Sequence, residues 1–289
     1  RDVERSRGLG DVYKRQDTMS SFSSWGVPGS LELKPEITAP GGSILSVNGE
    51  VKDTDQYFLM SGTSMAAPQV TGLTALLMQY FRETGLAEKA GVSPRVLAHS
   101  LLMSTAQPLY EEASGGYYSL LKQGAGLAKV DDALAAQAYV LVDGQHDGKV
   151  KAELGDDPER TGVYEMTFEV VNFSDSDKTY TLDTTVLGQK AVGGLMKYGQ
   201  VTHLTYEYAR ELDTDITYSA ADGKVTVPAG ETVKVTATVA LTEGEKEYYD
   251  ERFPCGAYVE GFVHLNSEDD VNLSIPFLGF YGDLSLIHI

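Results

Sequence analysis

The sequence has little cysteine, few basic residues and no long apolar run, and each shortage excludes something. Cys255 is the only cysteine, so no disulfide can form within the chain. The 23 Lys and Arg residues face 42 Asp and Glu residues, and a net charge of −19 argues against a nucleic-acid partner, which needs clustered basic side chains. The longest apolar stretches, residues 72–78 and 133–142, are too short or too polar to span a bilayer, so no membrane span is expected.

The two ends of the chain are unlike the rest. Residues 11–16 (Asp-Val-Tyr-Lys-Arg-Gln) and 284–289 (Leu-Ser-Leu-Ile-His-Ile) can be encoded by DNA strings that are reverse complements of each other. These strings resemble the mosaic end used in transposon-based library preparation. We therefore interpret residues 1–16 and 284–289 as adapter-encoded artefacts and leave them out of the fold prediction. On this interpretation the gene continued on both sides.

The pattern of the chain predicts two domains. Residues 17–141 alternate short strands with helices, and a polar, glycine-bearing stretch at 142–148 predicts the joint. Strands are expected at 43–47 and 56–60, and helices at 63–82, 93–105 and 129–138. Beyond the joint no helix is expected, and the turn spacing suits a β-sandwich with strands at 164–172, 178–186, 224–227, 232–241, 256–265 and 271–280.

The segment 60–70 is where chemistry is predicted. A strand ends, Gly62 permits a tight turn, and Ser64 opens the long helix. The Ser64 hydroxyl would then lie beside free backbone N–H groups at the positive end of the helix dipole, where an oxyanion is stabilised. Pro68 is expected near the first turn, where a missing N–H costs least. By geometry alone, an ordinary capped helix start is the favoured interpretation.

The residue string reverses that preference. Gly62-Thr-Ser-Met-Ala-Ala-Pro68 resembles the nucleophile motif of the subtilisin-like serine proteases, G-T-S-M-A-x-P. Upstream, residues 20–26 followed by 34–42 (Lys-Pro-Glu-Ile-Thr-Ala-Pro-Gly-Gly) resemble a second hallmark of this family, in the expected order. Residues 123–127 (Gln-Gly-Ala-Gly-Leu) are similar to the segment that closes such catalytic domains. Two independent strings in the right order make the resemblance specific.

The second half narrows the resemblance. Residues 225–230, 259–263 and 273–283 resemble the fibronectin type III-like module of lactocepin-type cell-envelope proteinases. The resemblance implies an α/β fold for residues 17–141, as the C-terminal portion of a subtilisin-like parallel-sheet domain. It implies an all-β fibronectin type III-like sandwich for residues 148–283. It also implies a secreted serine endopeptidase, extracellular or attached to the cell envelope, that acts on proteins or peptides and is expected to be a monomer.

The same resemblance implies roles for individual residues. Ser64 would be the catalytic nucleophile, its own N–H would be one oxyanion donor, and the Thr63 side chain would assist. Gly62 and Met65 would adjoin the substrate. In this family the triad runs Asp, His, Ser, so the Asp, the His and an oxyanion Asn are expected upstream of Asp17, and the chain alone is expected to be inactive. No cofactor is implied, metal ligands are not assigned, and structural calcium in the intact enzyme is compatible with the family.

Several other residues receive more ordinary predictions. The five histidines (His99, His146, His203, His264 and His288) are expected to have surface or packing roles. Tyr248, Tyr249 and Phe253 are expected to pack. The helix at 63–82 is apolar nearly all round, which is typical of a helix buried inside a protein, so the chain by itself should expose apolar surface.

Two alternative functions stay open. An α/β-hydrolase would also place a serine after a strand, but its Asp and His follow the serine, and His146 would have to serve. A degenerate protease could instead be a non-catalytic scaffold or adhesion module at the cell surface. Reading D-[ST]-G and H-G-T-H motifs in the upstream gene would favour the protease over both.

Overall fold

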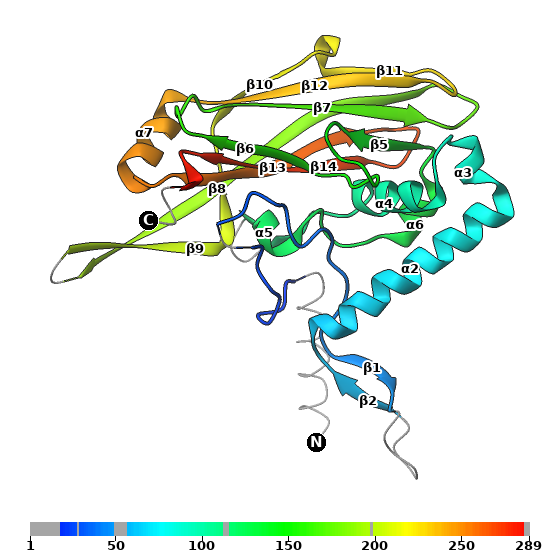
Figure 1. Cartoon of the computed structure of the whole chain (residues 1–289), viewed down its shortest axis with the longest axis horizontal. Helices are drawn as coiled ribbons and strands as arrows, with labels where there is room; N and C mark the ends of the chain where they lie inside the picture. Colours follow the sequence, from blue (N-terminus) through cyan, green and yellow to red (C-terminus); the bar gives the residue numbers. More distant parts are fainter. Residues whose placement is uncertain (1–17, 28, 49–56, 112–115, 197–198, 286–289) are drawn as a thin grey trace.

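The computed structural model describes residues 18–27, 29–48, 57–111, 116–196 and 199–285 (Figure 1). Two layers of β-sheet form its larger part, and helices with short hairpins lie below them in the view of Figure 1. Among the described residues, no helix is long and apolar enough to cross a membrane.

One sheet has four antiparallel strands. Their spatial order is β10 (Thr214–Tyr218), β12 (Thr232–Leu241), β7 (Val163–Asn172) and β5 (Ala138–Val142). Tyr164, Met166, Phe168 and Val170 of β7 alternate into the core, with at most 4% of each exposed, and the glutamates between them point outward. The period-2 pattern therefore predicted both the strand and its buried face.

The second sheet has six strands and one parallel pair. Its order is β11 (Lys224–Val227), β8 (Lys178–Met196), β13 (Ala257–Asn266), β14 (Leu273–Tyr281) and β6 (Ala152–Asp157), and β9 (Gly199–Glu211) pairs with β8. β14 and β6 run parallel, whereas the other pairs are antiparallel. The β8–β9 hairpin extends beyond the sandwich (Figure 1).

The outer face of the six-stranded sheet is also buried. Along β13, Val259 and Val263 join the sandwich core, while Tyr258 and Phe262 pack on the other side of the sheet. There they meet residues from the first half of the chain, of which Leu33 is 0% exposed. A second cluster joins Leu97 of the first half to Tyr139 of β5 and to Phe173, which directly follows β7. The two predicted domains therefore share buried apolar contacts.

The first half is built mainly from helices: α2 (Thr63–Thr84), α3 (Leu86–Lys89), α4 (Pro94–Ser104), α5 (Leu120–Gln123) and α6 (Val130–Ala135). Its short strands form two antiparallel hairpins, β1 (Ile44–Val47) with β2 (Tyr57–Met60), and β3 (Tyr110–Glu111) with β4 (Gly116–Tyr117). In the described part before β5, parallel pairing is limited to one bridge between Thr38 and Leu127. The expected parallel sheet therefore stays a prediction about sequence outside this chain.

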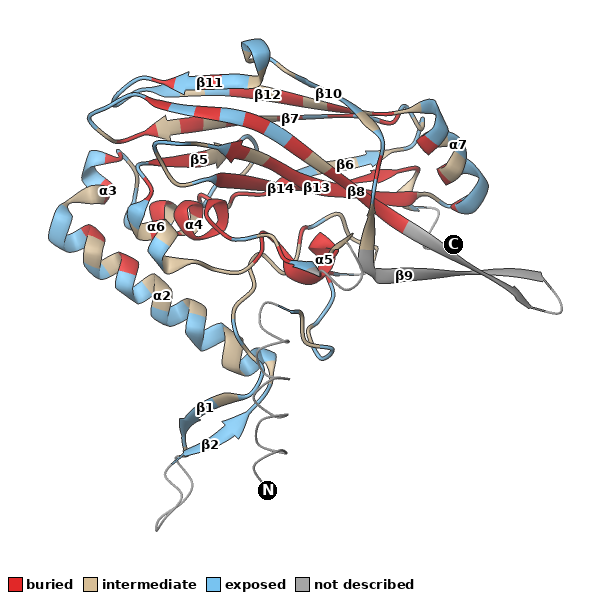
Figure 2. Ribbon diagram, turned by 180° about the vertical axis from the view of Figure 1, so that it is seen from behind, coloured by how far each residue is buried: buried red, intermediate tan, exposed pale blue. Residues whose placement is uncertain are grey.

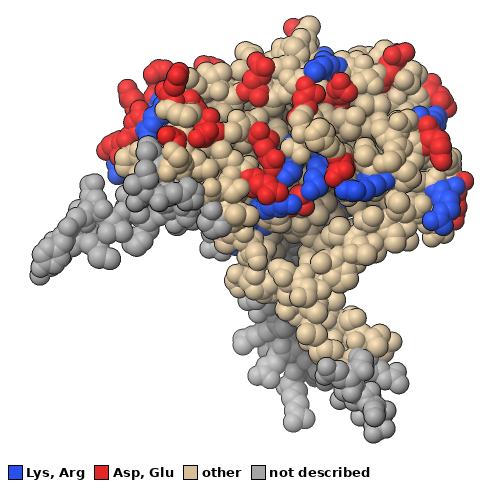
Figure 3. Space-filling model, in the orientation of Figure 1, with Lys and Arg blue, Asp and Glu red and all other residues tan. Residues whose placement is uncertain are grey.

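Apolar surface is exposed around α2, as predicted. Only Leu77 and Phe81 of this helix are buried, and all of the apolar side chains of β2 are exposed. The β1–β2 hairpin projects from the body beside the start of α2 (Figures 1 and 2). In Figure 3, charged side chains cover the upper body, while the described surface at this lower end is uncharged.

The structure corrects two expectations. A helix, α7 (Glu243–Arg252), lies in the half where no helix was expected. Only Glu245 and Tyr249 of α7 are buried, so it has almost no apolar stripe that a periodicity analysis could find. The helix expected at 129–138 is shorter, because α6 ends at Ala135 and β5 starts at Ala138. β5 pairs with β7, so sheet hydrogen bonds cross the predicted division at residue 141, and the position of the domain boundary stays a prediction.

Candidate active site at the start of helix α2

Ser64 is exposed and is the second residue of α2. Thr63 before it is also exposed, and Gly62 and Met65 are half-buried. The Met65 N–H donates to the Gly62 carbonyl over 3.0 Å, whereas neither the hydroxyl nor the N–H of Ser64 has a hydrogen-bond partner among the described residues. The serine that the motif singles out therefore presents a free hydroxyl and a free N–H on the same residue.

The positive end of α2 is left uncompensated. The N-cap is Gly62, which has no side chain to cap the helix, and the first turn contains no acidic residue. Helix α4 differs, because the Ser93 hydroxyl accepts a hydrogen bond from the Val96 N–H over 3.3 Å. Since both a capping side chain and a nearby carboxylate would neutralise the partial positive charge, the start of α2 keeps its capacity to stabilise an anion.

The glycine that this site needs for close packing is Gly41. Gly62 has φ 162° and ψ 161°, an extended conformation that any residue can adopt, so its backbone angles do not require a glycine. The Gly62 N–H donates to the Gly41 carbonyl over 2.8 Å. A Cβ atom on Gly41 would lie 2.8 Å from the Gly62 carbonyl oxygen and 3.2 Å from the Ala66 Cβ. The backbone at residue 41 therefore has to approach the start of α2 without a side chain.

The segment containing Gly41 is held by the segment around residue 125. The Thr38 N–H donates to the Gly126 carbonyl over 2.8 Å, and the Ala128 N–H donates to the Thr38 carbonyl over 2.9 Å. Gly124 has φ 63°, and a Cβ there would lie 2.3 Å from the Pro35 carbonyl oxygen. The three strings that carried the sequence resemblance therefore form one connected unit: residues 123–128 hold 34–41, and 41 holds the start of α2.

Pro68 lies deeper in α2 than expected. It is the sixth residue of the helix, past the first turn. An α-helical N–H at this position would bond to the carbonyl four residues earlier, which is that of Ser64. Because proline has no N–H, Pro68 leaves the Ser64 carbonyl without this helical donor.

His99 and His264 make contacts with residues other than Ser64. The His99 Nδ1 donates to the Asp147 carbonyl over 2.8 Å, and the His264 Nε2 lies 3.3 Å from the Thr185 hydroxyl. Burial lowers the pKa of His264. His146 is exposed in the turn after β5, and His288 lies outside the described residues. The side chain of His203, on β9, also lies outside the described residues. Among the described side chains, none of His99, His146 and His264 is hydrogen-bonded to Ser64, and no group of three His, Cys, Asp or Glu residues could hold a metal ion.

Comparison with known families assigns both halves. Residues 9–129 match the model of the subtilase family, and residues 153–278 match the model of an Fn3-like domain. The first half of the chain is thus similar to the subtilase family, and the second half is similar to Fn3-like domains. The subtilase match begins eight residues before the predicted start at Asp17, so the adapter interpretation of residues 1–16 stays a prediction.

Curated relatives extend the match over both halves. A C5a peptidase of Streptococcus pyogenes is 32% identical over 267 residues, covering 92% of this chain and 21% of the relative. A PII-type proteinase of Lactococcus lactis subsp. cremoris is 29% identical over 283 residues, covering 93% of this chain and 14% of the relative. The chain thus spans about a fifth or less of the length of these relatives. Among solved structures, a FixG-related protein of Vibrio parahaemolyticus matches 50% of this chain and 94% of its own at 12% identity, with a TM-score of 0.27, too low to bear on function.

Sequence reasoning missed the residues that hold the subtilase segment from the Fn3-like side. Glu153 on β6 accepts a hydrogen bond from the Leu33 N–H, and Glu260 on β13 accepts bonds from the Ser119 hydroxyl and the Leu120 N–H. Single acidic residues in strands carry no motif, and their partners lie 120 to 141 residues away. Only the fully apolar surroundings of Glu260 in the sequence, Val259 before it and Gly-Phe-Val after it, could have signalled a buried carboxyl.

Proposed function

We propose that this chain is part of a secreted serine endopeptidase, extracellular or held at the cell envelope, in which Ser64 is the nucleophile. The observation that carries the proposal is the exposed Ser64 at the open, uncompensated start of α2, within a G-T-S-M-A-A-P string in subtilase-family sequence. The names of the relatives, a C5a peptidase and a PII-type proteinase, support proteins or peptides as the substrate class. We expect the protein to act as a monomer.

In the proposed reaction the Ser64 oxygen attacks the carbonyl carbon of a peptide bond. The carbonyl oxygen becomes an oxyanion, and the Ser64 N–H together with the positive end of α2 would stabilise that charge. Thr63 would assist from the same turn, and Met65 would flank the leaving group. A serine hydroxyl is a weak nucleophile without a base, so a histidine oriented by an aspartate is required.

The aspartate, the histidine and an oxyanion asparagine are proposed to come from sequence outside these 289 residues. In subtilisin, where the values were measured, losing one oxyanion donor costs about a hundred- to a thousand-fold in kcat. Losing the histidine there costs about a million-fold. The 289-residue chain alone is therefore expected to cleave nothing measurable.

The test uses the full gene product that contains this chain. Cleavage of casein and labelling of the protein by a fluorophosphonate probe are both expected, and Ser64→Ala should abolish both. Thr71→Ala is the matched control, because it removes an exposed hydroxyl from the same helix, where that hydroxyl bonds only the Ala67 carbonyl. The control should keep full activity. Cleavage or labelling that survives Ser64→Ala would rule out Ser64 as the nucleophile, and an unlabelled, inactive wild type would favour the scaffold or adhesion module.

A further inference from the structure

Two side chains at the start of the Fn3-like half, Lys151 and Glu153, contact the backbone of Leu33. Glu153 Oε1 accepts a hydrogen bond from the Leu33 N–H over 2.9 Å, and the Lys151 amine lies 3.4 Å from the Leu33 carbonyl. Lys151 and Glu153 are bound to each other over 2.5 Å, and only 4% of the Lys151 side chain is exposed. The pair therefore satisfies both backbone groups of a residue that is itself fully buried.

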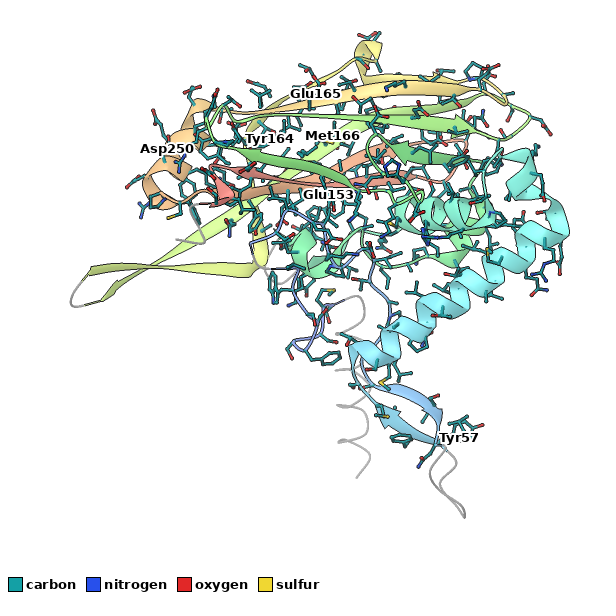
Figure 4. All side chains as sticks on the ribbon, viewed as in Figure 1. Tyr57, Glu153, Tyr164, Glu165, Met166 and Asp250 are labelled. Atoms are coloured by element: carbon teal, nitrogen blue, oxygen red, sulfur yellow. The ribbon has the colours of Figure 1, made fainter. Side chains whose placement is uncertain are left out.

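The Glu153 carboxylate stays ionised in this position. Burial alone would raise its pKa, but hydrogen bonds from Lys151, Leu33 and Gln145 outweigh burial and hold the pKa below its usual range. Figure 4 labels Glu153 on the side of the sandwich that faces the first half of the chain. Hydrogen bonds to an ionised group are stronger than neutral ones, so this contact is well suited to hold a backbone segment in one place.

Ion pairs of Glu36 hold the same segment at a second point, three residues after Leu33. Glu36 Oε1 accepts from Lys149 over 2.7 Å and from Lys34 over 2.6 Å. Burial opposes the charge on Glu36, but the two lysines hold its pKa below the usual range. Lys149 and Lys151 both lie at the entry to β6, so one short stretch of the Fn3-like side fixes two points of the 33–36 segment.

From this segment a short path leads to the nucleophile. The chain continues from Glu36 to Gly41, whose carbonyl accepts from the Gly62 N–H over 2.8 Å, and Ser64 is two residues beyond Gly62. Gly41 and the start of α2 are so close that a single Cβ would not fit between them. A displacement of the 33–41 segment would therefore be passed to the first turn of α2.

We propose that Lys149 and Glu153 of the Fn3-like half are positioning residues for Ser64. They act through the 33–41 segment and touch neither substrate nor reacting atoms. On this proposal the Fn3-like domain helps to fix the position of the nucleophile. This inference rests on the proposed function, since it presupposes that Ser64 attacks the substrate.

The test compares four variants of the full gene product with wild type. Glu153→Ala removes the acceptor for Leu33, Glu153→Gln keeps an oxygen that can accept the same bond, and Lys149→Met removes the pair with Glu36 but keeps an apolar stem. Asp143→Ala is the control, because Asp143 pairs with Lys234 of β12 on the surface and not with the 33–41 segment. For each variant, kcat and KM on a peptide substrate, the rate of fluorophosphonate labelling and the thermal unfolding midpoint are measured.

Glu153→Ala and Lys149→Met should lower kcat and the labelling rate in parallel, by roughly tenfold, because small misplacements of a nucleophile are costly. KM should change less than twofold, Glu153→Gln should restore most of kcat, and Asp143→Ala should match wild type. Wild-type kcat and labelling in folded Lys149→Met would overturn the proposal, as would a change confined to KM. Lys149→Met decides the matter if Glu153→Ala does not fold. Labelling that persists in Ser64→Ala would instead refute the proposed function itself.

Discussion

Replacing Glu260 by Gln should change how the stability of this chain depends on pH. Glu260 is fully buried on β13, and its Oε2 accepts from the Ser119 hydroxyl and from the Leu120 N–H, each over 3.0 Å. Burial raises the pKa of Glu260 from its usual value of 4.5 to about 7, although these hydrogen bonds oppose the rise. Desolvation of the charged form therefore outweighs the donors around it.

The sign of the effect follows from proton binding. Between pH 4.5 and pH 7 the folded chain keeps a proton on Glu260 that the unfolded chain has released. The stability that this proton provides is complete below pH 4.5 and is lost as the pH rises through 7. With 1.36 kcal/mol for each pH unit between the two pKa values, the loss is about 3 kcal/mol. Glutamine carries no titratable proton, so this pH-dependent loss is absent from Glu260→Gln. The free energy of unfolding of Glu260→Gln, relative to that of wild type, should therefore rise by about 3 kcal/mol as the pH goes from 4.5 to 8.

Urea unfolding of the 289-residue chain at several pH values measures this difference. Trp25 is the only tryptophan and lies beside Lys122 of α5, whose amine is 5.3 Å from the ring centroid, so its fluorescence reports on the segment that Glu260 holds. Glu243→Gln is the control, since the Glu243 side chain is 85% exposed and pairs only with Lys246. If the stability difference between Glu260→Gln and wild type is the same at pH 4.5 and pH 8, the reasoning about Glu260 is refuted.

Two further predictions concern the start of α2 in the full gene product. Peroxide should lower activity by oxidising Met65, because the sulfoxide adds bulk and polarity beside Gly62, where a Cβ would lie 3.7 Å from the Met65 sulfur. Met65→Ala should remove most of this sensitivity in a casein assay. Unchanged sensitivity in Met65→Ala would contradict the prediction. Gly41→Ala should lower kcat roughly tenfold or more, because its Cβ would displace the Gly62 backbone. Gly42→Ala is the control, since the nearest atom to its Cβ would be 3.4 Å away, and equal losses in both variants would argue against the contact.

Elements with a strong local pattern could be predicted from the sequence. The period-2 alternation along β7 predicted its buried face and its end at Asn172, with the start one residue late, and Ser93 with Pro94 marked the start of α4. Helix α7 could not be predicted, because two buried side chains, Glu245 and Tyr249, are too few to produce a period. The parallel pairing of β14 with β6 was also missed, since the register of strands distant in sequence depends on contacts that no local pattern records.

Some features of the candidate site could likewise be predicted from the sequence, and others could not. The string around Ser64 predicted a serine at the start of a long helix, and the structure has Ser64 there, where it is exposed. The string did not indicate which glycine is sterically required, because only the approach of residue 41 to the Gly62 carbonyl decides that. Nor could it reveal Glu153 and Lys149, whose importance depends on a segment more than a hundred residues earlier.

The place of β5 in the four-stranded sheet bears on how the sandwich could be isolated. Cutting the chain after residue 142 would remove a flanking strand and bare the main-chain donors and acceptors of β7 from Phe168 to Asn172. The exposed edge of β7 could then pair with strands of other chains, so such a piece would tend to aggregate. Starting at Gln137 keeps the ladder intact and also retains the Gln137 N–H that donates to the Asp270 carboxylate.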